Sequence, residues 1–300
     1  MTTGFAIRPA RPEDAAAVAA VRRLVFPYKV MPADMVRRAI TTHRPREQSV
    51  ALVAERDGAV VGWGNAGLNI WTSTPGQGKA TIFVHPDHRR AGIGSELSER
   101  LHRHLADAGA ERTQSFIQPD SMGFAAERGY AEIRRMHFSG VQLAELPDRP
   151  ATPDGVTLRS YDELDPRAAY TAEMLASVDE PTDTPTDSIS YDEWIKDFWN
   201  DPAIDKHLSF AALVGDEVAS FTISETDGDR MWSAFSGTVP AYRGRRLSKL
   251  VKAAALHRAT AAGVAAAYTS NDDRNGPMLA VNDWLGYRRT ATEIGAARTM

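Results

Sequence analysis

Residues 81–97 read Thr-Ile-Phe-Val-His-Pro-Asp-His-Arg-Arg-Ala-Gly-Ile-Gly-Ser-Glu-Leu, and this stretch decides the fold. It predicts an apolar strand, a turn at Pro86, a basic loop with two glycines, and then a helix. The free N–H groups and positive dipole end of a helix N-terminus attract an anion. Arg89 and Arg90 add charge, and the glycines remove the Cβ atoms that would block close approach. We therefore expect this loop to hold a pyrophosphate.

The composition is that of a globular protein with room for two domains. The chain has 300 residues, of which 43% are hydrophobic and 25% charged, and it contains no cysteine. Disulfides, zinc–thiolate sites and a nucleophilic protein thiol are therefore excluded. The apolar runs are too short to span a membrane, and the N-terminus lacks the apolar core of a signal peptide. The expected location is the cytoplasm, with no membrane partner.

The charge is unevenly distributed along the chain. Residues 1–150 carry 20 Lys and Arg against 16 Asp and Glu, a balance of +4, whereas residues 151–300 carry 15 against 23, a balance of −8. A nucleic-acid-binding domain is strongly basic, so no nucleic acid is expected as a partner. The mild positive bias of the first half suits a small polyanion better. His102 and His104 are two residues apart on a predicted helix and point in different directions, so no metal is expected.

The first half alternates strands and helices. A helix is predicted over an alanine-rich segment in which Val18, Val21 and Val25 share a face. Residues 50–55 and 59–63 predict a hairpin, since Asp-Gly lies in the turn between them. A second helix follows the opening stretch, with leucines repeating every four residues and Gly109 at its C-terminal end. Strands are expected at residues 112–117 and 135–141, with a short helix between them.

The pattern then repeats. Residues 146–155 contain three prolines and no periodicity, which predicts a linker. After it, Leu158-Arg159 matches Ile7-Arg8, Thr238-Val239-Pro240 matches Val84-His85-Pro86, and Leu285-Gly286-Tyr287 matches Arg128-Gly129-Tyr130, each about 150 residues later. We infer a duplication, with one domain over residues 1–145, the linker over 146–155, and a second domain over 156–300.

The loop over residues 89–94 resembles the acetyl-CoA signature of the GCN5-related N-acetyltransferase (GNAT) superfamily, Arg/Gln-x-x-Gly-x-Gly/Ala. The order of elements around it matches that family along nearly the whole first half, so the chain resembles a tandem GNAT protein. The resemblance implies an α/β (α+β) fold, with a mixed, mostly antiparallel sheet flanked by helices in each domain. The sheet is expected to splay open after the strand that ends at Val84.

The resemblance also implies the cofactor-binding residues. Phe83 and Val84 would meet the pantetheine arm of acetyl-CoA through their backbone. Gln118 falls where the family often has an Asn that touches the cofactor. The residues expected to cradle the phosphates are Arg89, Arg90, Ala91, Gly92, Ile93, Gly94 and Ser95.

The second copy of the loop is degenerate. It reads Arg243-Gly244-Arg245-Arg246-Leu247-Ser248, so Arg246 stands in place of Gly92 and Ser248 in place of Gly94. A large side chain obstructs the close approach of backbone to phosphate. We expect the second domain to shape the substrate site rather than to form a second active site.

The implied reaction is attack of a neutral primary amine on the thioester of acetyl-CoA, so the chain is expected to be an acyltransferase. Its many Ala and Arg residues indicate a bacterial source. The tyrosine acid that many members place four residues before the late glycine is Ala125 here and Asn282 in the second half. Tyr28, Tyr130 or water could replace it, so no catalytic residue is assigned. The acceptor is expected to be a small molecule and the protein a monomer or homodimer. Two alternatives remain: the second domain is the catalytic one, or the chain is a non-catalytic acyl-CoA sensor or interaction protein.

The segment over residues 179–201 holds eight acidic residues and one Lys, with Tyr191, Trp194 and Phe198 at helical spacing. It is interpreted as an acidic loop followed by a helix that packs its aromatic face. The alternative is that its carboxylates attract a cationic amine substrate.

Overall fold

The structure, a computed structural model, describes residues 4–300, and their contacts divide them into two compact units. The first unit comprises residues 4–27, 31–135 and 293–300. The second comprises Tyr28–Val30 and Met136–Thr292. Each unit is described by itself.

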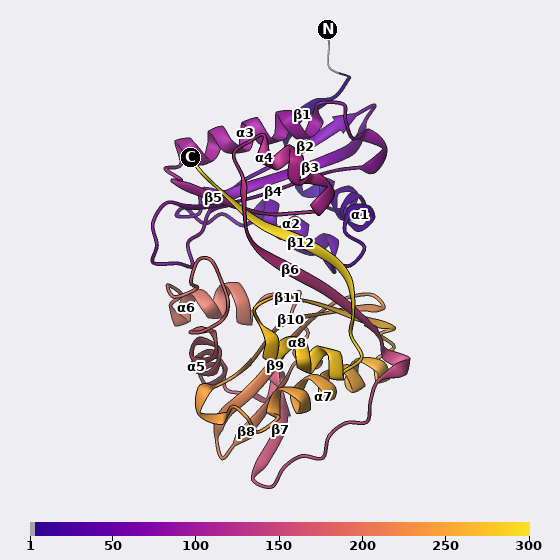
Figure 1. The fold of residues 1–300 in the computed structure, drawn as a ribbon, viewed down its shortest axis with the longest axis vertical. Coiled ribbons are helices and arrows are strands. Elements are labelled where there is room, and N and C mark those ends of the chain that lie inside the picture. The colour runs from indigo at the N-terminus through magenta and orange to yellow at the C-terminus, as the bar shows by residue number, and fades with distance from the viewer. Residues whose placement is uncertain (1–3) are drawn as a thin grey trace. The chain divides into compact units, whose positions relative to one another are not determined.

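The sheet of the first unit is mixed and mostly antiparallel (Figure 1). Only its β4–β5 pair is parallel among the described strands. The spatial order is β1 (Ala6–Pro9), β2 (Val50–Arg56), β3 (Ala59–Leu68), β4 (Gln77–Val84), β5 (Arg112–Ile117) and the C-terminal part of β12 (Arg288–Thr299).

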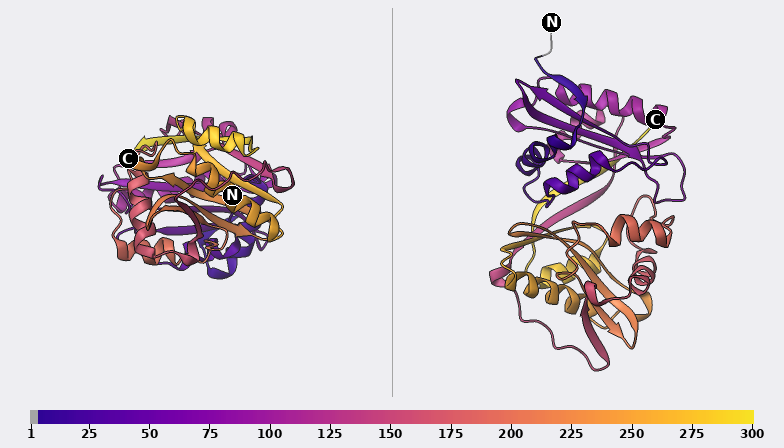
Figure 2. Two further views of the ribbon diagram at one scale, coloured as in Figure 1. Left: turned by 90° about the horizontal axis from the view of Figure 1, so that it is seen from below. Right: turned by 180° about the vertical axis from the view of Figure 1, so that it is seen from behind.

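Helices cover both faces of this sheet. One face is covered by α3 (Ile93–Asp107), and the other by α1 (Ala15–Val25) and α2 (Ala33–Thr41), as Figures 1 and 2 show. The side chains of Leu97, Leu101 and Leu105 are completely buried between α3 and the sheet. The helix packs so closely that a Cβ on Gly64 would lie 3.0 Å from Leu101 Cδ1. The helical repeat of leucines therefore predicted the buried face correctly.

The turn signals of the first half are confirmed as well. Asp57 and Gly58 both have positive φ, at 51° and 79°, as the two central residues of a tight hairpin turn require. Gly109 has a φ of 80° directly after the C-cap of α3, where a left-handed residue ends a helix. The short helix predicted before Gly129 is α4 (Met122–Ala126).

The second unit repeats this arrangement with its own strands. Its spatial order is β6 (Ala131–Gln142), β11 (Ala266–Asp272), β10 (Arg230–Thr238), β9 (Glu217–Asp227), β8 (Phe210–Val214) and β7 (Val156–Ser160). Helix α7 (Leu247–Ala261) packs on β8, β9 and β10, and α5 (Pro166–Ser177) packs on β9 and β10. The remaining helices are α6 (Tyr191–Trp194) and α8 (Gly276–Trp284). The fold class predicted from the sequence is confirmed.

The closing strands are exchanged between the two halves of the sequence. Residues 294–299 of β12 pair with β5 in the first unit, and residues 136–142 of β6 pair with β11 in the second. The domain boundaries 1–145 and 156–300 remain a prediction about the duplication. Residues 146–153, inside the predicted linker, have no regular structure, and the carbonyl of Pro147 accepts a hydrogen bond from His257.

The aromatic side chains around α6 form a buried cluster. Tyr191 and Phe198 are only half-buried, so the predicted aromatic face is confirmed in part. Trp194 is buried against Tyr170 and Trp199. Its indole Nε1–H donates to Glu173 Oε2 at 2.9 Å, and the hydroxyl of Tyr161 donates to Glu173 Oε1 at 3.4 Å. Burial raises the pKa of Glu173 to about 7. A carboxyl group in the core of the second unit is therefore about half protonated near pH 7.

We predict that Glu173→Gln stabilises the protein at alkaline pH. An acid whose pKa is higher in the folded state than in the unfolded state stabilises the fold at low pH, and that contribution is lost as the pH rises from about 4.5 to about 7. A neutral amide can accept from Trp194 through its oxygen and donate to the hydroxyl of Tyr161 through its nitrogen, without that loss. The free energy of unfolding of the variant should exceed that of the wild type by roughly 1–3 kcal/mol at about pH 8, and match it at about pH 4. Urea unfolding, followed by tryptophan fluorescence, measures the free energy of unfolding of each protein at the two pH values. The exposed turn variant Asp216→Asn is the control, and an equal gain at both pH values would contradict the prediction.

Candidate functional site

The loop between β4 and α3 has the backbone that its glycines predicted. Gly92 is the N-cap of α3, with a φ of 87°, and no side chain caps the helix. The first backbone bond into this helix runs from the N–H of Glu96 to the carbonyl of Gly92. Within residues 4–300, the N–H groups of residues 93–95 therefore have no acceptor. They point out of the helix end together with its positive dipole, as an anion site requires.

Beside this loop, two parallel strands separate. β4 pairs with β5 only where Gln77–Lys79 lies opposite Arg112–Gln114. From Ala80 to Val84, the edge of β4 that faces β5 has no partner strand in the described part of the chain. Backbone N–H and C=O groups on this edge are therefore available to a ligand.

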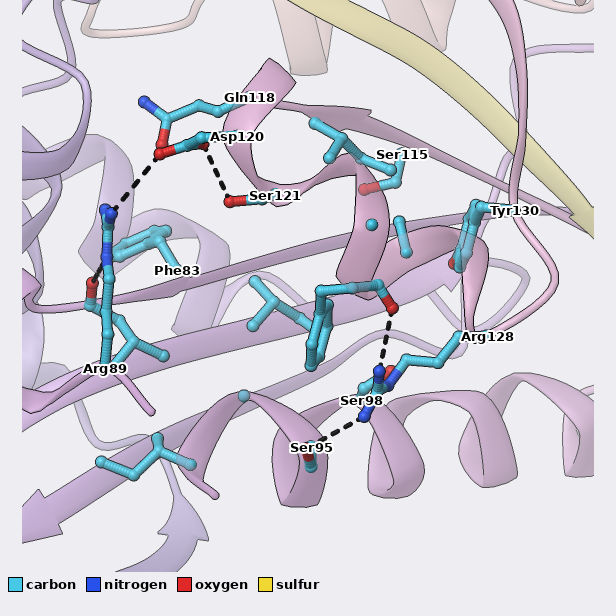
Figure 3. A pocket seen from close by; sticks show the side chains of 18 of the residues that line it. Phe83, Arg89, Ser95, Ser98, Ser115, Gln118, Asp120, Ser121, Arg128 and Tyr130 are labelled. Atoms are coloured by element: carbon cyan, nitrogen blue, oxygen red, sulfur yellow. Dashed lines mark hydrogen bonds and ion pairs between the residues drawn. The ribbon is translucent and has the colours of Figure 1, made fainter. Parts of the chain in front are cut away.

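The loop and the separated strands line a cavity of about 760 Å³ (Figure 3). This volume is typical of small-molecule sites. Nine of the residues predicted to bind the cofactor line this cavity: Phe83, Val84, Arg89, Arg90, Gly92, Ile93, Gly94, Ser95 and Gln118. Ala91 lies within the same loop, although it is not among the lining residues.

Several predicted residues already have contacts of their own. Phe83 is buried edge-on against Phe26, with ring centroids 5.9 Å apart. Arg89 donates from Nε to the carbonyl of Val84 and lies 3.9 Å from Asp120. Gln118 donates from Nε2 to the carbonyl of Val25 at 2.9 Å. These contacts fix the positions of the side chains around the cavity.

A third cation, which the sequence did not indicate, lies over the helix end. Arg128 donates to Ser95 Oγ at 2.9 Å, and its guanidinium lies 3.6 Å from the ring centroid of Phe124 (Figure 3). The Phe124 ring is partly exposed and would lie 3.6 Å from a Cβ on Gly94. The i, i+4 spacing of Phe124 in α4 and Arg128 in the turn after it was the available signal.

At another part of its wall, the cavity is lined by a histidine–tyrosine pair. His102 Nε2 lies 2.9 Å from the hydroxyl of Tyr130, and Arg298 Nη1 lies 3.2 Å from His102 Nδ1. Because an arginine can only donate, Nδ1 must accept, so Nε2 carries the proton and donates to Tyr130. The hydroxyl proton of Tyr130 is then available to another acceptor.

Electrostatics keeps this pair neutral. Burial, followed by the charges of Arg298 and Arg128, lowers the pKa of His102 to about 4. Burial also raises the pKa of Tyr130 to about 12. The pair therefore offers a neutral donor near neutral pH. Tyr28, the other tyrosine considered from the sequence, is not among the residues that line the cavity. Its ring packs on Phe138, with the ring centroids 4.9 Å apart.

The second unit has the same loop backbone with different side chains. Arg246 is the N-cap of α7 and has a φ of 60°, the left-handed conformation that Gly92 adopts in the first unit. Its side chain is exposed, and it borders a second cavity. The two positions that lack the usual tyrosine are both buried: Ala125 in α4, and Asn282 in α8, where it donates to Asn271 at 2.6 Å.

Within residues 4–300, no three His, Asp or Glu side chains come together as metal ligands. None of the described helices is both long and apolar enough to cross a membrane.

Comparison with known proteins agrees with this geometry. Residues 18–130 match the model of the acetyltransferase (GNAT) family. A GCN5-related N-acetyltransferase from Sphaerobacter thermophilus has the same fold over 98% of this chain and 95% of its own, with a TM-score of 0.75 and 20% identity. A tandem GNAT protein from the clavulanic acid biosynthesis pathway matches 98% of both chains, with a TM-score of 0.77 and 17% identity. Residues 18–130 are therefore a GNAT domain, the whole chain has the fold of tandem GNAT proteins, and the chain is an acetyl-transferring acyltransferase.

Among proteins of assigned function, the chain is similar to mycothiol acetyltransferases of actinobacteria. It is 27% identical to that of Actinosynnema mirum over 253 residues, which cover 82% of each chain. It is 26% identical to that of Amycolatopsis mediterranei over 261 residues, or 82% of this chain and 83% of the relative.

We predict that His102 remains neutral, with its proton on Nε2, from about pH 5 to about pH 8, because its pKa is lowered to about 4. Nitrogen-15 NMR of the histidine rings measures both the tautomer and the titration. Arg298→Met removes one of the lowering charges, so the pKa of His102 should rise. Arg103→Met, on the exposed side of the same helix, is the matched control. A protonated ring at neutral pH in the wild type would contradict the assignment.

Proposed function

We propose that the first unit binds acetyl-CoA in its 760 Å³ cavity and transfers the acetyl group to the primary amine of a small molecule. The observation that carries the proposal is the combination of an uncapped helix end at Gly92 with the free edge of β4. The helix end offers N–H donors to a pyrophosphate, and the free edge of β4 offers backbone groups to an extended arm that contains amides. Acetyl-CoA has both parts.

The charges around the helix end support the pyrophosphate assignment. Arg90 makes no hydrogen bond or ion pair within the described residues, and its backbone is left-handed with a φ of 62°. Arg89 and Arg128 line the same cavity. Three arginines beside free N–H groups match a doubly charged diphosphate, because charge-assisted hydrogen bonds are about twice as strong as neutral ones.

The chemistry needs little beyond positioning. A neutral amine attacks the thioester carbonyl, the C–S bond breaks, coenzyme A leaves as a thiolate, and the proton that the nitrogen loses passes to the thiolate or to water. A backbone N–H on the free edge of β4 would polarise the carbonyl. A free thiol has a pKa of about 8.5, so its thiolate can leave without an acid. No catalytic residue is assigned, and the neutral Tyr130 is the phenol in the cavity wall that could donate a proton.

The similarity to mycothiol acetyltransferases favours a small acceptor over a protein. These relatives share more than four fifths of this chain's length. A mycothiol-type amine is therefore the first acceptor to test.

We predict that Gly92→Glu weakens acetyl-CoA binding by about a hundredfold or more, because it adds a carboxylate at the phosphate site. Gly244→Glu is the matched control: Gly244 has a φ of 77° in the second loop, so the backbone strain is similar. Isothermal titration calorimetry with acetyl-CoA measures both variants. If Gly244→Glu loses affinity and Gly92→Glu does not, the donor site lies in the second unit.

We also predict that thiol release from acetyl-CoA depends on a small amine. The panel contains a mycothiol-type amine that lacks the acetyl group, simple amino sugars, amino acids and a lysine-containing peptide. Turnover should be at least about tenfold faster with one of the small amines than with the peptide. Faster turnover of the peptide would contradict the small-molecule assignment. Acetyl-CoA binding without release for any amine would favour a sensor.

A further inference from the structure

The second unit has a cavity of its own, of about 710 Å³. It lies where β10 and β11 separate, because these parallel strands pair only at Arg230–Trp232 and Ala266–Tyr268. The loop before α7 and the helix itself form another part of its wall. The second cavity therefore lies among the elements of its unit that correspond to those around the first cavity. These elements, α7, β10 and β11, are labelled in Figure 1.

A buried lysine in this cavity wall has no acidic partner. Lys252, on α7, is 2% exposed, and its ammonium donates to Ser233 Oγ at 2.7 Å and to Ser236 Oγ at 3.4 Å. The ring of Tyr287 is 5.7 Å from Nζ, and its hydroxyl has no hydrogen-bond partner. Among the described residues, no carboxylate forms an ion pair with Lys252. Buried charges are normally paired, so this site lacks a counter-ion.

Most of the other charged side chains in the cavity wall are also cationic. The second half of the sequence has a net charge of −8, yet the wall contains six cations, Arg243, Arg245, Arg246, Lys249, Lys252 and Arg274, against the acids Asp179 and Glu180. Two of the arginines are neutralised: Arg243 by Asp179 at 2.8 Å, and Arg274 by Asp272 at 2.8 Å. An excess of positive charge remains in the cavity wall.

The first cavity differs at the corresponding position. When the two loops are aligned, Ser98 in α3 corresponds to Lys252 in α7. Ser98 and the neutral His102 line the first cavity, so this part of its wall carries no charge. The duplication has therefore produced two cavities of similar size but different charge.

We propose that the cavity of the second unit binds a small anion, whose carboxylate or phosphate group pairs with Lys252. The ammonium and the two serine hydroxyls form the inner contact, and Arg246 and Arg245 in the loop are available to a second anionic group. This site is separate from the acetyl-CoA site proposed for the first unit.

The test uses the full chain with succinate, inorganic phosphate and coenzyme A as probes, in calorimetry at about pH 6. At least one probe should bind, and Lys252→Met should weaken it by about a hundredfold, since a buried ion pair is lost. Arg258→Met, on the exposed side of the same helix and outside the cavity wall, should change the affinity by less than about threefold. The probe that depends on Lys252 shows whether the anionic group is a carboxylate, a free phosphate or that of a nucleotide.

The pH dependence provides a second measurement. Burial lowers the pKa of Lys252 to about 7. The groups that face it are the hydroxyls of Ser233 and Ser236 on β10 and the neutral ring of Tyr287 before β12. Because only the ammonium pairs with an anion, affinity should fall about tenfold per pH unit above about pH 7. Lys252→Arg stays charged, so its affinity should not show this fall.

The Lys252→Met variant is expected to remain folded, so a loss of affinity reports on the binding site. Lys252→Met replaces an unpaired buried charge with an apolar side chain of similar length, so its melting temperature should not be lower than that of the wild type. If no probe binds the wild type, or if every probe binds Lys252→Met equally well, the proposal is wrong.

Discussion

Both units depend on one feature: a pair of parallel strands that remains hydrogen-bonded over only part of its length. β4 and β5 remain paired for only three residues, and so do β10 and β11. Beyond those residues each unit has an open strand edge, and a helix end points toward the gap through a left-handed N-cap, Gly92 or Arg246. An edge inside a domain must be covered or used, since unpaired backbone groups are costly when buried. The cavities follow from this single feature of the strand pairing.

The two units illustrate how a duplicated backbone diverges. The N-cap conformation is the same although Gly92 in one unit corresponds to Arg246 in the other, where it costs modest backbone strain. What has changed is the side chain that each long helix presents to its cavity, Ser98 in one and Lys252 in the other. At this position the first unit therefore has a neutral side chain, whereas the second unit has a lysine. Similar backbones therefore support different binding properties.

Local features of the fold could be predicted from the sequence, and long-range ones could not. The Asp-Gly hairpin, the leucine face of α3 and the glycine loop follow from short-range rules. The pairing of β12 with β5 does not, because periodicity carries no information about which distant strand is the partner. The contact of His102 with Tyr130 and Arg298 joins three distant parts of the sequence. Lys252 lies in an alanine-rich helix and resembles a surface residue until its burial is known.

The exchanged strand also affects the synthesis of the protein. β5 is complete at Ile117, but its neighbour in the sheet is made of residues 294–299, about 180 residues later. At the usual rate of translation this interval lasts roughly ten to forty seconds. During that time the nascent first half has an open sheet edge, which is a known site of aggregation. The order of synthesis therefore makes the completion of the first sheet depend on the translation of the second half.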